Sequence, residues 1–344
     1  MCKTMFAAFV VLLGLDAAAA AQTCSSPALA DTVELKPLPG SDLVTVPVAI
    51  NGKPKQFLLA LSANPDEISA AAVSELALPQ VDQGKALSAM SEQNSTFQFE
   101  APVFDVRGTS TVRNYQSRVL VASFTMGGAT VPNLGFLVSS DRDMGKSKPY
   151  DGLLTASGFR KYDIDLDFGG KKLSFLTATG CTDPNQIVRW PHTGVAVIAM
   201  TASNGQMSVP VTIEGHAIDA VIDTGSDHTV MRRSVAERVF GLKADTPDMM
   251  QDGDVRDGAG ERVYRHTFPQ IAFEGVVASN VPALIQVNSM VRKTRRAATT
   301  GSRLQAADDP GDPVPELSLG MDVLHQLHLY IVFGQNKLYV TPAQ

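Results

Sequence analysis

The chain has little of what marks nucleic-acid-binding and membrane proteins. Basic residues form no long stripe, and the formal net charge is -6, so a general surface for nucleic-acid phosphates is excluded. The N-terminal apolar run, Phe6 to Leu15, is shorter than the about 20 residues that span a bilayer. These absences favour a small molecule or a peptide as the ligand.

Residues 1–21 have the layout of a secretory signal peptide. Lys3 precedes the apolar run, and an alanine-rich stretch ends at Ala21. We predict cleavage between Ala21 and Gln22 and an exported protein, periplasmic or secreted and bacterial. After removal of the signal, no membrane partner is expected.

Cysteine is scarce, with three residues in the whole chain. Cys2 leaves with the predicted signal, so the exported protein retains Cys24 and Cys181. An even pair in an oxidising compartment favours a disulfide between them. Two buried thiols are the alternative.

The histidines do not form a metal-binding motif. His325 and His328 are three residues apart, but only Asp322 accompanies them as a nearby acidic ligand, and no cysteine does. We therefore expect no metal and no cofactor.

The strongest organisational signal is an internal repeat. The segment that begins at Val46 matches the one that begins at Val209 without a gap, an offset of 163 residues. A later block places Gly169 on Gly334, an offset of 165, and Val131-Pro132 was paired with Val281-Pro282 at 150. The chain consists of two diverged copies of one design.

Each copy reads as mainly β with short helices. Apolar or alternating runs separated by glycine-containing turns predict several short strands per copy, and such patterns suggest a closed or folded-over barrel. Helices are expected within 69–78 and 232–242. We predict a first lobe at 22–176, a polar linker at 177–205 that holds Trp190, and a second lobe at 206–344.

The segment "VIDTGSDHTVM" follows a buried strand and precedes a helix, and "LSLGMDVL" comes about a hundred residues later. In this setting the chain resembles the retropepsin-like and pepsin-like aspartic proteases, and most closely bacterial exported proteins with tandem retropepsin-like domains. The resemblance implies two β-barrel lobes related by a pseudo-twofold axis. It also implies that Asp223 is catalytic, with Thr224 and Gly225, and that Ser226, Leu319 and Gly320 support the site.

The resemblance also exposes a difference between the copies. Peptide hydrolysis in this family uses two carboxylates that share one proton, one from each lobe. The first copy has Ala60, Leu61 and Ser62 in place of Asp-Thr-Gly, and Thr155 in place of Gly320. The first lobe is therefore expected to be degenerate and unable to supply its carboxylate.

Four nearby acidic residues are candidate replacements for that carboxylate. Asp66 and Glu67 lie six and seven residues after Ala60, Asp151 precedes the pair Leu153-Leu154, and Asp227 lies four residues after Asp223. A dyad tolerates little displacement, so we interpret the first three as residues that cap a helix start or solvate loops, and Asp227 as an exposed capping residue.

The resemblance further implies a flap that closes over the substrate. The interval 251–268 is the candidate, with Gly258 and Gly260 among its hinges. An ordinary surface loop is the equal alternative, because glycine enrichment marks both.

Two functions remain open from the sequence. The first is an aspartic endopeptidase that acts on a peptide or protein substrate and completes its dyad in trans, in a homodimer. The second is a non-catalytic pseudoprotease that binds peptides or a partner protein between its lobes.

Overall fold

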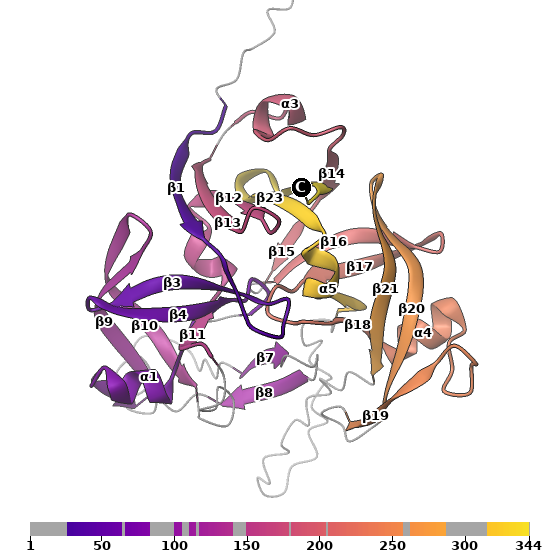
Figure 1. Cartoon of the computed structure of the whole chain (residues 1–344), viewed down its shortest axis with the longest axis horizontal. Coiled ribbons are helices and arrows are strands. Elements are labelled where there is room, and N and C mark those ends of the chain that lie inside the picture. Colours follow the sequence, from indigo (N-terminus) through magenta and orange to yellow (C-terminus); the bar gives the residue numbers. More distant parts are fainter. Residues whose placement is uncertain are drawn as a thin grey trace, which may run out of the picture.

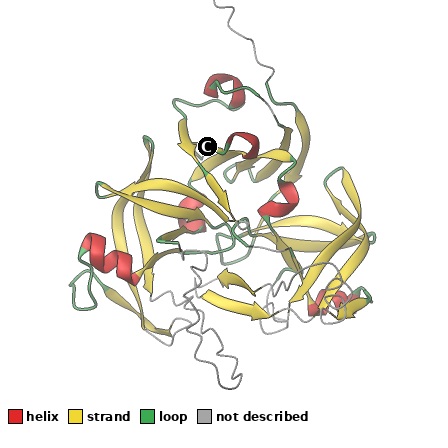
Figure 2. Cartoon of the chain, turned by 180° about the vertical axis from the view of Figure 1, so that it is seen from behind, coloured by secondary structure: helices red, strands yellow, loops and turns green. Residues whose placement is uncertain are grey.

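The computed structural model describes residues 26–63, 66–82, 100–104, 110–114, 117–139, 149–178, 180–203, 206–256, 262–286 and 315–343. Strands dominate these residues, as predicted (Figure 2). The predicted signal peptide, Cys24, Gly258 and Gly260 lie outside them, so the predictions at these positions stay predictions. No helix in the described part of the chain is long and apolar enough to cross a membrane.

The first lobe is an eight-stranded sheet that closes on itself. Its order is β2-β3-β4-β11-β5-β10-β9-β6, and an additional pairing of β3 with β9 completes a ring of six strands. The bounds are β2 Lys36–Pro37, β3 Val44–Ile50, β4 Lys53–Leu59, β5 Glu67–Ser69, β6 Gln80–Asp82, β9 Ser117–Met126, β10 Ala129–Ser139 and β11 Gly152–Leu154.

The second lobe repeats this arrangement strand for strand. Its order is β15-β16-β17-β22-β18-β21-β20-β19, and β16 pairs with β20 to close the ring. The bounds are β15 Thr201–Ser203, β16 Gln206–Ile213, β17 His216–Ile222, β18 Thr229–Arg232, β19 Met250–Arg256, β20 Arg262–Phe273, β21 Val276–Gln286 and β22 Leu317–Leu319. The two lobes lie side by side in Figure 1.

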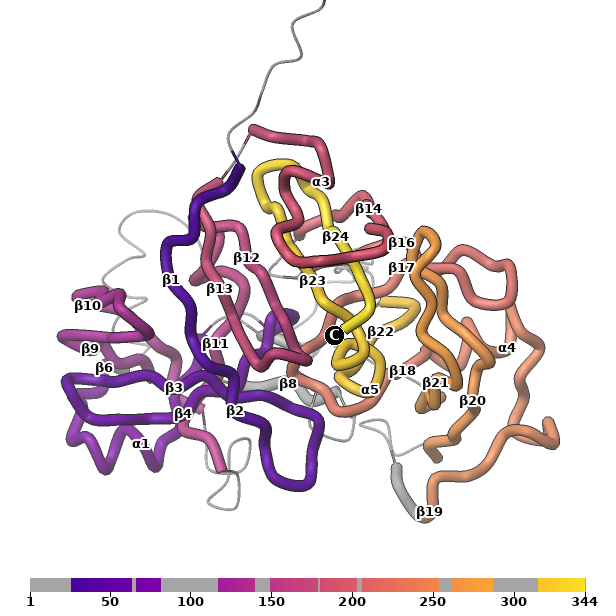
Figure 3. The backbone as a smooth tube through the Cα atoms, turned by 45° about the horizontal axis from the view of Figure 1, so that its top comes forward, coloured from indigo at the N-terminus to yellow at the C-terminus, as the bar shows by residue number. Residues whose placement is uncertain are grey.

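A six-stranded sheet joins the lobes, in the order β1-β13-β12-β23-β24-β14. Figure 3 shows most of these strands next to one another above the two barrels. The bounds are β1 Leu29–Glu34, β12 Tyr162–Asp167, β13 Lys172–Thr177, β14 Ala196–Ala199, β23 Leu327–Val332 and β24 Lys337–Pro342. Each half of the chain supplies three strands, so neither half can form this sheet alone.

The pairing registers of this sheet repeat at the offset found in the sequence. At one edge Val33 lies opposite Leu173, and at the other Ile198 lies opposite Leu338. Both members of the second pair are 165 residues beyond those of the first. In the middle, Asp165 lies opposite Tyr330, which is again 165 residues later.

One part of the predicted repeat alignment is wrong. Leu137 pairs with Glu67 in the first lobe, and Leu284 pairs with Val230 in the second, which sets an offset of 147 along β10 and β21. The equivalent asparagines, Asn133 and Asn280, both have a φ of 53°. The match of Val131-Pro132 to Val281-Pro282 was three residues out of register because a short Val-Pro dipeptide recurs by chance within β-rich sequence.

The segment predicted as a polar linker is partly ordered into the sheets. It contains β14 and β15, and α3 (Pro184–Ile187) begins with the Asp183 carboxylate accepting a hydrogen bond from Asn185 N. Trp190 stacks on His328 of β23, with ring centroids 3.6 Å apart. Cys181 is buried in this segment. The Cys24–Cys181 disulfide stays a prediction, since Cys24 is not described.

The two predicted helices are present, and each makes an ion pair with its lobe. In the second lobe Arg238 of α4 (Arg233–Phe240) forms a 2.9 Å ion pair with Glu316. The equivalent residues of the first lobe, Glu75 at the end of α1 (Ala70–Glu75) and Asp151, are both acidic. The ammonium group of buried Lys55 lies 2.6 Å from one and 3.4 Å from the other, and so replaces the missing opposite charge.

The two remaining paired strands are β7 (Glu100–Phe104) and β8 (Ser110–Asn114), which form a separate two-stranded sheet. They lie below the middle of the molecule in the view of Figure 1, on the side away from the six-stranded sheet.

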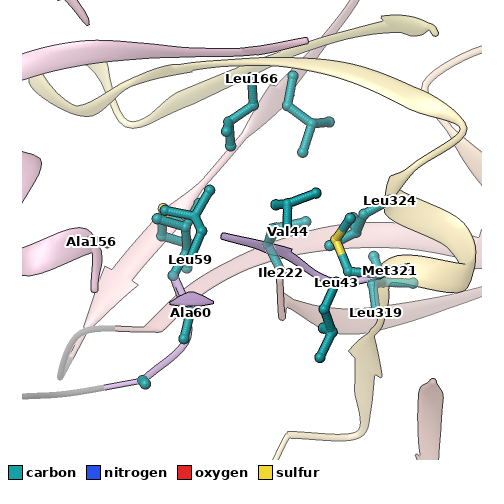
Figure 4. Packing of buried hydrophobic residues seen from close by; sticks show 14 of the residues in the cluster. Leu43, Val44, Leu59, Ala60, Ala156, Leu166, Ile222, Leu319, Met321 and Leu324 are labelled. Atoms are coloured by element: carbon teal, nitrogen blue, oxygen red, sulfur yellow. The ribbon is translucent and has the colours of Figure 1, made fainter. Parts of the chain in front are cut away.

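One continuous apolar core runs through both lobes and under the six-stranded sheet. In Figure 4, Leu59 and Ala60 of the first lobe approach from one side, Ile222 and Leu319 of the second lobe lie on the other, and Leu166 of the sheet lies above them. The loops between the lobes therefore pack against an apolar core that both lobes share.

This shared core predicts the effect of a cavity where strands of the two halves pair. Ile331 is fully buried on β23 and lies opposite Ile164 of the other half. Ile331→Ala should lower the free energy of unfolding by about 2–5 kcal/mol, measured by urea denaturation. Val277→Ala, at a half-exposed position of β21, is the control and should stay within about 0.5 kcal/mol. Equal effects of the two changes would contradict this account.

Candidate active site

Two equivalent loops meet where the lobes face each other. In the second lobe β17 runs parallel to β22, and Asp223 N, just past the strand end, donates to Leu319 O at 2.9 Å. In the first lobe β4 runs parallel to β11, and Ala60 N donates to Leu154 O at 2.8 Å. Ala60 thus holds the place in its lobe that Asp223 holds in the other.

The tips of the two loops are in contact. A Cβ atom placed on Gly225 would lie 3.0 Å from the Cβ of Ala60 and 3.4 Å from Asp223 Oδ1. Glycine at 225 therefore allows the second loop to approach the first this closely. The structure brings Asp223, Gly225 and Ala60 together, as the repeat alignment predicted.

Thr224 fastens the loops across the lobes. Its buried hydroxyl accepts a hydrogen bond from Leu61 N at 2.9 Å and donates one to Leu59 O at 2.8 Å. Leu61, the equivalent residue of the first lobe, is fully buried and has no hydroxyl to return these bonds. The second loop therefore makes this pair of hydrogen bonds without an equivalent pair from Leu61.

The carboxylate of Asp223 is 1% exposed and accepts three hydrogen bonds. Ser62 Oγ donates to Oδ1 at 2.5 Å, Gly225 N donates to Oδ1 at 3.1 Å, and Ser318 Oγ donates to Oδ2 at 3.1 Å. Burial raises the pKa of Asp223 above its usual value, and these hydrogen bonds offset part of that rise.

Two predicted supporting residues lie under the Asp223 loop. Ser226 Oγ donates to His228 O at 2.9 Å, which closes the turn after the loop. A Cβ atom on Gly320 would clash with the carbonyl group of His228 and lie 2.7 Å from Thr229 N. Gly320 N donates to the Thr229 hydroxyl, which in turn donates to Asp322. Only glycine leaves room for this close stacking of backbone on backbone.

The first lobe solves the same problem with different side chains. Thr155, at the position of Gly320, donates its backbone N–H to Asp66 Oδ1 at 2.7 Å, where the second lobe uses Thr229. Burial raises the pKa of Asp66, and the bonds from Thr155 oppose that rise. The prediction that Asp66 caps a helix is wrong, since Ser69 caps α1 by accepting from Ala72 N. Sequence periodicity could not show this, because the partner lies 89 residues away.

Asp227 also differs from its predicted role. Its carboxylate accepts a hydrogen bond from Ser41 Oγ at 2.5 Å and another from Asp42 N at 3.0 Å. These donors belong to the loop before β3 in the first lobe, whereas α4 begins only at Arg233. Asp227 therefore ties the lobes together rather than capping a helix.

Two side chains of the site were missed by the sequence reasoning. Ser318 and Ser41 make the contacts just described, with Asp223 and Asp227 respectively. Ser318 stood inside the quoted "LSLG" segment, so its position beside Asp223 could have been inferred from the resemblance. Ser41 carried no signal, because its contact depends on how the lobes meet.

The predicted flap interval forms a hairpin. β19 and β20 are antiparallel, with Gln251 opposite Tyr264, and Arg265 pairs with Asp252 at 3.2 Å. Its tip, with Gly258 and Gly260, lies outside the described residues. Whether it closes over a substrate stays a prediction.

The two histidines considered for a metal face different partners. His325 Nδ1 lies 2.5 Å from Met321 O, and His328 Nε2 lies 2.5 Å from Asp165 on the six-stranded sheet. Their ring nitrogens do not converge on one point.

A protein family and several solved structures are similar to this chain. Residues 209–323 match the family model described as aspartyl protease. Basic 7S globulin from soybean is similar in structure at 11% identity and a TM-score of 0.47, over 90% of this chain and 94% of that one. Conglutin gamma, a unique basic 7S globulin from lupine seeds, is similar at 9% identity and a TM-score of 0.47, over 92% of this chain and 95% of that one.

A retropepsin-like aspartic protease from Rickettsia conorii gives 12% identity and a TM-score of 0.30, over 45% of this chain and 96% of that one. No curated protein sequence matches the chain significantly. The described residues are mainly β, with a ring-closing sheet in each lobe, and residues 209–323 are similar to the aspartyl protease family. The family match confirms the resemblance and supports an aspartic protease-like function.

The buried carboxylate predicts how stability depends on pH. Because the pKa of Asp223 is raised on folding, its contribution favours the folded state below its ordinary pKa and is lost as the pH rises through the raised value. Asp223→Asn should therefore stabilise the protein at neutral pH, by roughly 2 °C in Tm for each kcal/mol regained. The gain should shrink towards acid pH.

Differential scanning calorimetry at several pH values measures this difference. Asp219→Asn, at an exposed position on β17, is the control and should not raise the Tm at neutral pH. A loss of stability in Asp223→Asn at neutral pH would contradict the account.

The packing of Gly320 gives a second prediction. Gly320→Ala should cost more than about 3 kcal/mol or prevent folding, since the obstacle is backbone that cannot rotate away. Gly334→Ala, in the turn between β23 and β24 with open space around its Cβ, should be tolerated. Soluble yield and Tm of both variants measure the contrast, and a tolerated Gly320→Ala would refute the packing argument.

Proposed function

We propose that this protein is an aspartic protease-like protein that binds a peptide or a partner protein at the inter-lobe site around Asp223, and that a single chain does not cut it. Position 60, opposite Asp223, holds alanine, which has no carboxylate. Hydrolysis in this family needs a second carboxyl group to share the proton and protonate the carbonyl oxygen.

The observation that carries this proposal is the bonding of Thr224. A partner chain that completed a dyad in trans would have to meet the Asp223 loop where the first lobe now meets it. That face is occupied within the chain, since Thr224 bonds to Leu59 and Leu61 and Asp223 bonds to Ser62. Displacing the first lobe would also break the six-stranded sheet, in which β12 pairs with β23.

A second candidate is the aspartic endopeptidase whose dyad is completed by Asp223 of another chain. The complete Asp-Thr-Gly motif of the second loop favours this candidate. Thr224 and Gly225 make the contacts that a working loop needs, and Gly320 is packed beneath it. This candidate requires a homodimer, whereas the first works as a monomer.

Assaying the wild type beside a variant with a restored first lobe tests the proposal. Ala60→Asp, Leu61→Thr, Ser62→Gly and Thr155→Gly together should rebuild the dyad within one chain, because the two loops already touch. We expect monomeric wild type to leave denatured casein intact at pH 3–7 in the assay. The quadruple variant should cut it on the acid side, and adding Asp223→Asn should abolish the cutting.

Size-exclusion chromatography of the same samples identifies the state that acts. Cutting by a dimeric wild type, abolished by Asp223→Asn, would establish the second candidate in place of the first. Peptides retained from a library by immobilised wild type test binding directly. Failure of the folded protein to retain any peptide would remove the binding proposal.

Three further proposals rest on the sequence. The chain is exported after removal of residues 1–21, and Cys24 is bridged to Cys181. The lobes are related by a pseudo-twofold axis, which the constant 165-residue offset of the sheet registers supports. Mass spectrometry of the exported protein under non-reducing conditions tests the first two.

A further inference from the structure

Ser62 stands out because the family pattern has glycine at its position. It is 8% exposed, and its hydroxyl makes the shortest of the three hydrogen bonds to Asp223, 2.5 Å to Oδ1. Oδ1 is also the oxygen that accepts from Gly225 N within the second loop. The hydroxyl thus reaches the side of the carboxylate that faces the first lobe.

The geometry of the equivalent glycine explains why a side chain fits at 62. A Cβ atom on Gly225 would meet two groups, Ala60 of the other loop and Asp223 of its own. Because the two loops are equivalent, we infer that the Cβ of Ser62 faces Asp223 of the other loop and residue 60 of its own. Alanine at 60 leaves the room that an aspartate would fill. Ala60 and Ser62 are therefore linked substitutions.

The energetic cost of burying an unpaired carboxylate explains why Ser62 accompanies Ala60. In a complete dyad each carboxyl has the other as a hydrogen-bond partner through the shared proton. An unpaired buried carboxylate is costly unless hydrogen bonds replace that partner. If Ala60 were present without Ser62, Asp223 Oδ1 would accept only the hydrogen bond from Gly225 N.

We propose that Ser62 is a positioning residue that replaces the missing second carboxyl group, donating its proton to Asp223 Oδ1 and holding the single carboxylate in place between the lobes. This inference rests on the proposed role of Asp223 as the one carboxylate of the site. It deepens that proposal, because the first lobe has then lost its own carboxylate and also gained a serine that hydrogen-bonds to the remaining one, Asp223.

The test follows the Asp223 carboxyl by ¹³C NMR of protein labelled at the aspartate side-chain carbon, without any peptide. The resonance is assigned by its loss in Asp223→Asn. Ser62→Ala removes the donor to Oδ1, and the matched control Ser318→Ala removes the donor to Oδ2. Loss of a hydrogen bond to the charged form should increase the proton affinity of the Asp223 carboxylate. We expect an increase of roughly tenfold or more in Ser62→Ala and a smaller one in Ser318→Ala. Ser62→Gly, the residue of the other lobe, is the second variant.

A double-mutant cycle gives an independent readout. Ala60→Asp should destabilise the protein strongly when Ser62 is present, because the new carboxylate and the serine side chain compete for one place. Ser62→Gly should relieve this, with a coupling on the order of tenfold in the folding equilibrium constant. An unchanged titration in Ser62→Ala and Ser62→Gly, or additive effects in the cycle, would overturn the proposal. Because no substrate is present, the result does not depend on whether the protein binds peptides.

Discussion

The hydroxyl of Thr224 is the contact on which the rest of the site depends. It bonds to the backbone of the first loop as both donor and acceptor, and so fixes the distance between two loops that belong to different halves of the chain. Both atoms of the first loop that it contacts are backbone atoms of residues 59 and 61. Substitution of the side chains in that loop therefore leaves the connection intact, which explains how the first lobe could change its chemistry without separating from the second.

The first lobe keeps the backbone of its counterpart while replacing the side chains that support it. Where the second lobe satisfies Gly320 N with a threonine hydroxyl, the first satisfies Thr155 N with the Asp66 carboxylate. Where the second pairs Arg238 with Glu316, the first has two acids bridged by Lys55. A buried donor or charge must have a partner, but the partner can be supplied by different residues. The fold constrains hydrogen-bonding capacity at these positions more tightly than residue identity.

The lobes are also joined beyond the two loops. Asp227 accepts from Ser41 and Asp42, and the six-stranded sheet interleaves strands from both halves. A single continuous core lies beneath these connections. The two halves are therefore joined by contacts of three kinds, and an arrangement in which the second lobe exchanged its partner would have to give up all of them. This is the structural basis for preferring a site that works within one chain.

The sequence by itself determined the repeat, the strand-rich halves, and the place of Asp223 opposite Ala60, because these follow from local hydrophobic pattern and from gap-free matches. It misplaced the Val-Pro match by three residues, since a dipeptide in a strand carries little register information and only the pairing of β10 with β5 fixes it. Only the tertiary structure decided that Asp66 supports Thr155, that Asp227 joins the lobes, and that Ser62 bonds to Asp223. Each of these contacts brings together residues between 89 and 186 positions apart. Such contacts leave no periodic trace in the sequence, because they depend on the packing of completed strands and loops.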